Sequence, residues 1–227
     1  MSLHLVRQLV AVTVSIAAGI ALSGQCRKPT WWTGRLFLSI MNARHSRLTD
    51  WGLSHVSLER HFTMLDVGCG GGKTISKLAA AANAGKVYGI DYSAASVAVA
   101  RHTNRQRIQT GQVDIRLGSV SQLPFPDSTF EIVTAVETHY YWPNPVEDLR
   151  EILRVLKPGG RLVVIAEAYR SRPSDVLVQP VMKLLRARYW SVAEHRELFS
   201  SAGYAEIEIV EERSRGWICA IGTKPST

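Results

Sequence analysis

Cysteine is scarce in this chain of 227 residues and occurs only at Cys26, Cys69 and Cys219. Residues so far apart form neither a zinc-ligand spacing nor the disulfide framework of a small secreted domain. The sequence therefore excludes a disulfide-rich scaffold, and we expect no metal site. For the folded part of the chain we expect a reducing, cytoplasmic location.

Acidic residues are also in deficit, with 19 Asp and Glu against 27 Lys and Arg, which gives a net charge of +8. Such an excess fits an acidic substrate or an anionic membrane surface, and it fits equally well a charge that serves solubility alone. The chain has no arginine-rich arm, zinc-finger spacing or RNA-binding aromatic signature, so we expect no nucleic-acid partner. No pattern indicates an oligomeric state.

The chain lacks an apolar run of the roughly 20 residues that span a bilayer comfortably. Its N-terminal run, Leu9 to Leu22, is uncharged but shorter, and basic residues follow it at Arg27, Lys28 and Arg35. Three interpretations stay open: a membrane-associated segment that leaves the domain in the cytoplasm, a soluble helix or extension, and a cleaved signal. We expect residues 1–26 to form this extension, residues 27–61 a helical cap, and residues 62–227 the main domain.

From Met64 onward, short β-rich runs alternate with helical patterns. We expect strands at 62–67, 86–90, 113–117, 130–136, 161–166, 205–210 and 216–222, and helices at 73–82, 94–103, 146–156, 176–188 and 192–202. This order predicts an α/β fold: a Rossmann-like, doubly wound, mostly parallel seven-stranded sheet that ends in a C-terminal antiparallel strand pair.

A glycine-rich turn, Asp66-Val67-Gly68-Cys69-Gly70-Gly71-Gly72, follows the first expected strand. Glycine lets a backbone turn sharply and approach a ligand closely, and the N–H groups of the next helix then face that ligand. Nucleotide-binding dehydrogenases share the G-x-G pattern, but here Lys73 replaces their third glycine.

Asp91 ends the second expected strand. An acidic residue there can accept hydrogen bonds from the ribose hydroxyls of a dinucleotide or a nucleoside cofactor. The alternative is a surface residue that caps the following helix.

Together these motifs resemble the class I S-adenosylmethionine-dependent methyltransferase family, in its small-molecule, UbiE-like (methyltransferase type 11) branch. The matching pieces are LDVGCGGG at 65–72, GID at 89–91, LPF at 123–125, FEIV at 130–133 and LREILRVLKPGG at 149–160. The resemblance implies an enzyme that transfers a methyl group from S-adenosyl-L-methionine to a small-molecule acceptor.

The resemblance also implies cofactor contacts, which fall on Asp66, Gly68, Gly70, Asp91, Tyr92, Ser119, Val120 and Glu137. The two glycines would line the methionine part, Asp91 would hold the ribose, and Tyr92 would lie against the adenine. Ser119 stands where the family usually has an Asp that binds the adenine amino group, and its hydroxyl makes a weaker bond than a carboxylate. Glu137 would contribute backbone near the cofactor's amino-acid end.

Substrate recognition is expected from the segments around the sheet's carboxyl edge, at Asn42, His45, Tyr140, Tyr141 and Trp142. His139 is the one candidate general base, with a structural histidine in an aromatic turn as the alternative. The sulfonium methyl is already activated, so we expect a mechanism that rests mainly on positioning.

Two other functions share parts of this pattern. A nicotinamide-dependent oxidoreductase would use the same glycine turn and the same acidic residue. A methyltransferase-like module that binds the cofactor without turnover is the other alternative, and Ser119 is its only support in the sequence.

Overall fold

The computed structural model describes residues 46–167, 169–170, 182 and 187–226 of the chain. Within these residues seven strands form one sheet in the order β3-β2-β1-β4-β5-β7-β6. The strands are β1 (Thr63–Val67), β2 (Lys86–Asp91), β3 (Val113–Leu117), β4 (Phe130–Val136), β5 (Leu156–Ala166), β6 (Ala205–Glu212) and β7 (Trp217–Thr223).

The first five strands pair in parallel, whereas β7 pairs antiparallel with both β5 and β6. This confirms the predicted fold class, including the C-terminal antiparallel pair. Several boundaries differ from the prediction by one or two residues, and the largest difference is at β5. β5 begins at Leu156 instead of 161, because Leu156 already pairs with Phe130 before the register shifts and Arg161 pairs with Ile132.

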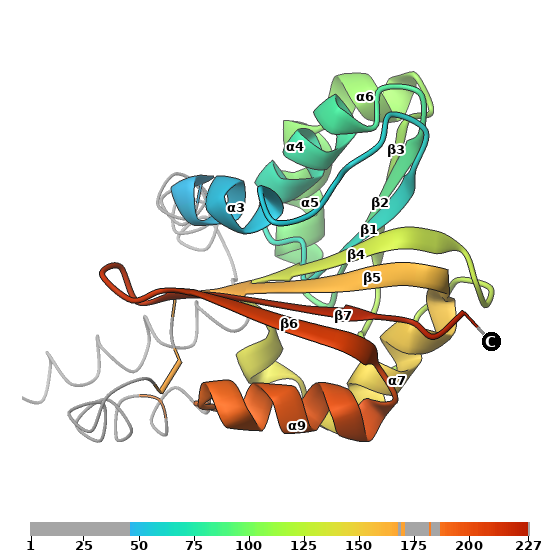
Figure 1. Ribbon diagram of the computed structural model, residues 1–227. Helices are drawn as coiled ribbons and strands as arrows, with labels where there is room; N and C mark the ends of the chain where they lie inside the picture. The colour runs from blue at the N-terminus through green and yellow to red at the C-terminus, as the bar shows by residue number, and fades with distance from the viewer. Residues whose placement is uncertain (1–45, 168, 171–181, 183–186, 227) are drawn as a thin grey trace, which may run out of the picture.

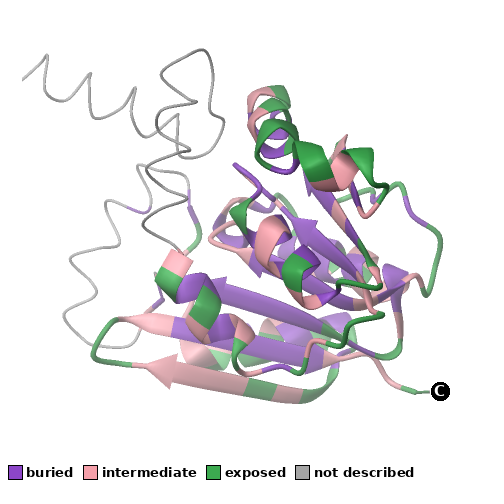
Figure 2. Ribbon diagram, turned by 90° about the horizontal axis from the view of Figure 1, so that it is seen from above, coloured by how far each residue is buried: buried purple, intermediate pink, exposed green. Residues whose placement is uncertain are grey.

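Helices cover both faces of the sheet (Figure 1). On one face lie α3 (Ser46–Leu53), α4 (Lys73–Ala81), α5 (Ala94–Thr103) and the short α6 (Arg105–Gln109), which the sequence did not predict. On the other face lie α7 (Pro145–Val155) and α9 (Val192–Ala202), which pack against each other. The central strands lie buried between these layers, whereas the edge strand β6 is half-buried to exposed, as Figure 2 shows.

The alternation of side chains along a strand separates the two largest core clusters, one on each face of the sheet. In β1, Leu65 and Val67 join the cluster under α7 and α9, whereas Met64 joins the cluster under α3, α4 and α5. Burial of both faces explains why the central strands β1, β4 and β5 carry long apolar runs, whereas the edge strand β3 alternates buried and half-buried residues. The sheet thus forms a rigid base from which the loops at its carboxyl edge project.

Several predictions concern residues outside the described part. The extension at 1–26, the beginning of the helical cap at 27–61, and most of the helix predicted at 176–188 lie there. Of that helix Met182, Ala187 and Arg188 are described; Met182 is helical, and Ala187 and Arg188 are not. Within the described ranges, no helix is both long and apolar enough to cross a membrane.

Candidate functional site

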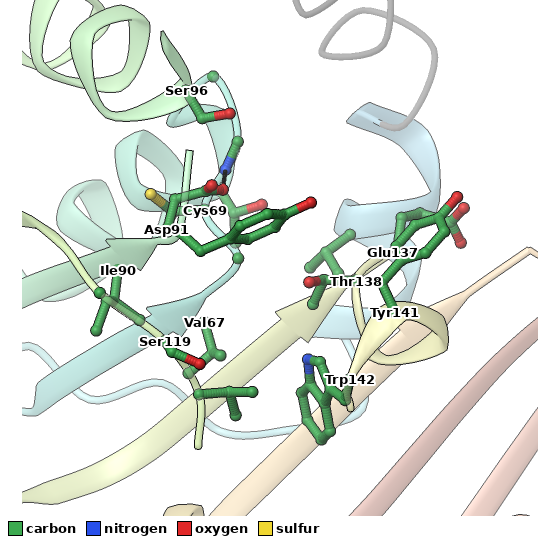
Figure 3. A pocket seen from close by; sticks show the side chains of 18 of the residues that line it. Val67, Cys69, Ile90, Asp91, Ser96, Ser119, Glu137, Thr138, Tyr141 and Trp142 are labelled. Atoms are coloured by element: carbon green, nitrogen blue, oxygen red, sulfur yellow. Dashed lines mark hydrogen bonds between the residues drawn. The ribbon is translucent and has the colours of Figure 1, made fainter. Parts of the chain in front are cut away.

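A cavity of about 460 Å³ opens at the carboxyl ends of β1, β2 and β4. Its volume is within the range of small-molecule sites. The strand order reverses between β1 and β4, and open α/β sheets bind ligands at such a reversal. The glycine turn forms one wall, and Tyr141 and Trp142 form the opposite one (Figure 3).

The glycine turn takes a backbone path that favours glycine. Gly68, Gly70 and Gly72 have φ angles of 72°, 49° and 78°, which side chains other than glycine rarely adopt. Gly72 is also the N-cap residue of α4, so the turn leads directly into that helix. Space is limiting at Gly68, where a Cβ atom would lie 2.1 Å from Oγ1 of Thr138.

Asp91 connects this turn to the end of β2. Its Oδ2 accepts a hydrogen bond of 2.9 Å from the backbone N–H of Gly70, and its Oδ1 accepts one of 2.9 Å from Ser93. Burial raises the pKa of the Asp91 carboxyl, and the two N–H donors and a side-chain hydrogen bond from Ser96 act in the opposite direction. The N-cap residue of α5 is Ser93, so the alternative that Asp91 caps this helix is wrong.

Asp66 lies at the base of the turn but does not line the cavity. Its side chain is buried, and the Thr134 hydroxyl donates a hydrogen bond of 2.7 Å to its Oδ1. Burial raises the pKa of Asp66 to about 7, with the Asp91 charge acting in the same direction and the Thr134 bond against it. Contact between Asp66 and a cofactor therefore stays a prediction, and its visible role is to support the turn.

The residues predicted for the adenine end, Tyr92, Ser119 and Val120, all line the cavity. The Ser119 hydroxyl accepts a hydrogen bond of 3.2 Å from the backbone N–H of Ser121. The loop that follows is held by Arg154, whose guanidinium donates to the carbonyl oxygens of Leu123 and Phe125. Part of the LREILRVLKPGG motif thus has a structural role, because it fixes this loop beside the cavity.

The opposite wall comes from the segment after β4. Glu137, Tyr141 and Trp142 line the cavity, whereas Tyr140 does not. Tyr140 is buried, and its hydroxyl donates a hydrogen bond of 2.9 Å to Oε1 of Glu137. Of the three predicted aromatic contacts, the structure therefore brings two to the site.

His139 lies outside this cavity. It is buried, and its Nε2 is 3.1 Å from Nε2 of His195 in α9. Because Nδ1 of His195 lies 2.8 Å from the carbonyl oxygen of Ser191, that nitrogen carries the proton, and His139 donates to Nε2 of His195. Burial lowers the pKa of both imidazoles. This arrangement favours the alternative of a structural histidine, and a role of His139 as general base stays a prediction.

Two predicted substrate residues, Asn42 and His45, lie outside the described residues. The predicted site residues leave out several that line the cavity, among them Ser46, Thr49, Lys73, Ser96 and Thr138. Lys73 and Thr138 stand next to the recognised motifs, and that proximity is the signal that could have found them. Among the residues that the structure describes, no cluster of three His, Cys, Asp or Glu side chains could hold a metal ion.

Comparisons with known proteins agree with this geometry. Residues 65–164, which hold the glycine turn, Asp91 and the wall after β4, match the family model described as a methyltransferase domain. The chain is 35% identical to the demethylmenaquinone methyltransferase of Lactiplantibacillus plantarum over 145 residues, which are 63% of this chain and 59% of that protein. Residues 65–164 thus match a methyltransferase domain, and over this part the chain is similar to S-adenosylmethionine-dependent methyltransferases.

Two further relatives extend the match within this family. An uncharacterized methyltransferase of Bacillus subtilis is 25% identical over 190 residues, which cover 83% of this chain and 97% of that protein. The structure of an S-adenosylmethionine-dependent methyltransferase from Aquifex aeolicus shares the fold, with a TM-score of 0.68, 20% identity, and coverage of 84% of this chain and 98% of that one. The chain spans only about half to three fifths of the length of several curated relatives that it matches.

The cavity fits the cofactor of this family, S-adenosylmethionine, by its own chemistry. It combines glycines with no room for a side chain, a carboxylate at the end of β2, and an aromatic wall at the far side. A nicotinamide oxidoreductase would share the first two features, but the family match does not support that alternative.

Proposed function

We propose that this protein transfers the methyl group of S-adenosylmethionine to a small acceptor that carries an aromatic or quinoid ring. The observation that carries the proposal is that the glycine turn, Asp91 and the aromatic wall of Tyr141 and Trp142 converge on one cavity. Relatives named demethylmenaquinone methyltransferase and 27-O-demethylrifamycin SV methyltransferase support a small organic acceptor.

The cofactor would extend from the glycine turn toward Ser119. In this arrangement Gly68 and Gly70 leave room for its methionine part, Asp91 accepts hydrogen bonds from its ribose, and Tyr92, Ser119 and Val120 border its adenine. Asp91 already accepts hydrogen bonds from the backbone N–H groups of Gly70 and Ser93 and from the side chain of Ser96. A carboxylate offers about four acceptor positions, so one remains for the ribose.

When bound, the sulfonium supplies a methyl group that is already activated for transfer. The chain's own task is then to hold the acceptor in line and to exclude water. No histidine lines the described wall of the cavity, and the Glu137 carboxylate is engaged by the Tyr140 hydroxyl and the backbone N–H of Glu167. The geometry therefore favours catalysis by positioning.

The test is a transfer assay that detects S-adenosylhomocysteine across a panel of phenols, hydroquinones and matched aliphatic alcohols. We expect product only with the ring-bearing acceptors. Trp142→Leu should raise the acceptor KM without changing affinity for S-adenosylhomocysteine. Equal turnover of the aliphatic alcohols would contradict the proposed acceptor class.

We also propose that residues 1–26 place the protein at an anionic membrane surface. The apolar run at 9–22 and the basic residues Arg27, Lys28 and Arg35 support this interpretation, since each basic residue near such a surface contributes about 1 kcal/mol. The full-length protein should sediment with vesicles that contain anionic lipid, and the double variant Val12→Asp, Ile16→Asp should not. Equal sedimentation of the two proteins would refute this role.

A further inference from the structure

Thr138 lines the cavity, and no sequence motif assigns a role to it. It follows β4 directly and precedes the short 3₁₀ helix η1 (His139–Tyr141). Its hydroxyl lies directly over Gly68, since a Cβ on that glycine would be 2.1 Å from Oγ1 of Thr138. In Figure 3 the side chain lies between Asp91 on one side and Glu137 with Tyr141 on the other.

The Thr138 hydroxyl is not used by the fold. Thr138 is the N-cap residue of η1, where a threonine side chain commonly accepts a backbone hydrogen bond, but here it makes no such bond. Among the described residues the hydroxyl has no other hydrogen-bond partner either. A polar group on a cavity wall, available and close to the glycine turn, is suited to bind a ligand.

The backbone before Thr138 is strained in a way that fixes the direction of this side chain. Glu137 has a φ angle of 56°, a left-handed conformation that costs a non-glycine residue about 1–3 kcal/mol. Three hydrogen bonds hold it: its N–H donates to Ile165, and its Oε1 accepts from the Tyr140 hydroxyl and from the N–H of Glu167. Strain maintained in this way is typical of functional sites.

We propose that the Thr138 hydroxyl accepts a hydrogen bond from the α-ammonium group of the cofactor. The assignment rests on the proposed function, which puts the methionine part of the cofactor against Gly68. The carboxylates of Asp91 and Glu137 both line this cavity, and negative charge on its walls favours a cationic group. A β-branched threonine is restricted at χ1, so its hydroxyl is preorganised for this contact.

The experiment measures binding of three probes to the full-length protein by calorimetry. S-adenosylhomocysteine carries ammonium and carboxylate, decarboxylated S-adenosylmethionine carries the ammonium alone, and 5′-methylthioadenosine carries neither. Thr138→Val keeps the shape and removes the hydroxyl. The variant should bind the first two probes about tenfold more weakly, because it loses a hydrogen bond to a charged group. Its affinity for the third probe should be unchanged.

Two further variants serve as controls. Thr138→Ser keeps a hydroxyl and should bind all three probes within about twofold of the wild type. Thr103→Val removes a hydroxyl that bonds within α5 to Val99, and it should change no affinity.

Three results would overturn the assignment. Equal weakening of all three probes by Thr138→Val would show a general loosening of the site, and weakening of S-adenosylhomocysteine alone would point to the carboxylate. Unchanged binding of every probe would show that the hydroxyl makes no contact. A wild-type protein that binds none of the probes overturns the proposed function itself, which separates that failure from the others.

Discussion

The backbone N–H of Gly70 donates a 2.9 Å hydrogen bond to Oδ2 of Asp91. This bond joins the glycine turn after β1 to the carboxyl end of β2, so two motifs 21 residues apart form one rigid unit. The turn therefore keeps its shape through a side chain that also faces the cavity. Substitution at Asp91 should affect both the turn and the ligand.

Asp91→Ala should weaken binding of S-adenosylhomocysteine about thirtyfold, or by roughly 2 kcal/mol, because the ribose hydroxyls lose their shared acceptor. Calorimetry on the full-length protein measures this loss. Asp114→Ala is the matched control, since Asp114 is a half-exposed partner of Arg116 on β3, outside the cavity. Affinity equal to that of the wild type in Asp91→Ala would refute the ribose assignment.

Gly68→Ala should abolish cofactor binding and reduce stability, because the new methyl group would collide with the Thr138 hydroxyl. Gly111→Ala serves as the control, because it introduces the same backbone strain without a collision. Gly111 has a similar φ of 76°, but a Cβ there meets nothing within 4 Å. We expect Gly111→Ala to cost about 1 kcal/mol in the free energy of unfolding and to leave cofactor affinity unchanged. Denaturant titration measures the stability of the two variants, and calorimetry measures their affinity for the cofactor. Equal losses of stability and affinity in both variants would show that crowding at Gly68 is unimportant.

Asp66 should make the protein less stable as the pH rises. Its folded-state pKa of about 7 lies above the ordinary value of 3.8. The folded state therefore holds this proton more tightly than the unfolded chain does, and stability falls between pH 4 and 7 before it levels off. Asp66→Asn cannot ionise, and its amide oxygen can still accept the Thr134 bond. The variant should lose that slope and gain a few kcal/mol of relative stability by pH 8. Parallel stability curves for the two proteins from pH 4 to 8 would contradict the assignment.

Ser119→Asp should tighten binding of S-adenosylhomocysteine severalfold, because a carboxylate accepts a stronger hydrogen bond from the adenine amino group than a hydroxyl does. Affinity for S-inosylhomocysteine, which lacks that amino group, should not improve. If both ligands gain equally, the effect is general attraction by the added charge and not recognition of adenine.

Most of the fold was predictable because the spacing of the apolar residues and the positions of the turn-forming residues indicated the same helices and strands. Helix α5 and strands β3 and β4 have the predicted boundaries. The antiparallel pairing of β6 with β7 followed from two β-rich runs without a helix between them. The start of β5 could not be predicted, since the segment from Lys157 to Gly160 ends α7 and yet stays in the sheet beside β4.

The site was predictable only where a motif fixes the backbone. Gly68, Gly70 and Asp91 line the cavity as their positions suggested. The neighbourhood of His139 was not predictable, because its partner His195 is 56 residues away and reaches it only through the packing of α9. The direction of the Thr138 side chain depends on the left-handed backbone conformation of Glu137, which no residue pattern predicts.

The most direct test of the central claim is a titration of the full-length protein with S-adenosylhomocysteine, repeated in the presence of S-adenosylmethionine or of NAD. We predict saturable binding with one ligand per chain, displaced by S-adenosylmethionine and unaffected by NAD. Failure to bind at millimolar ligand, or displacement by NAD, would contradict the assignment of the cavity.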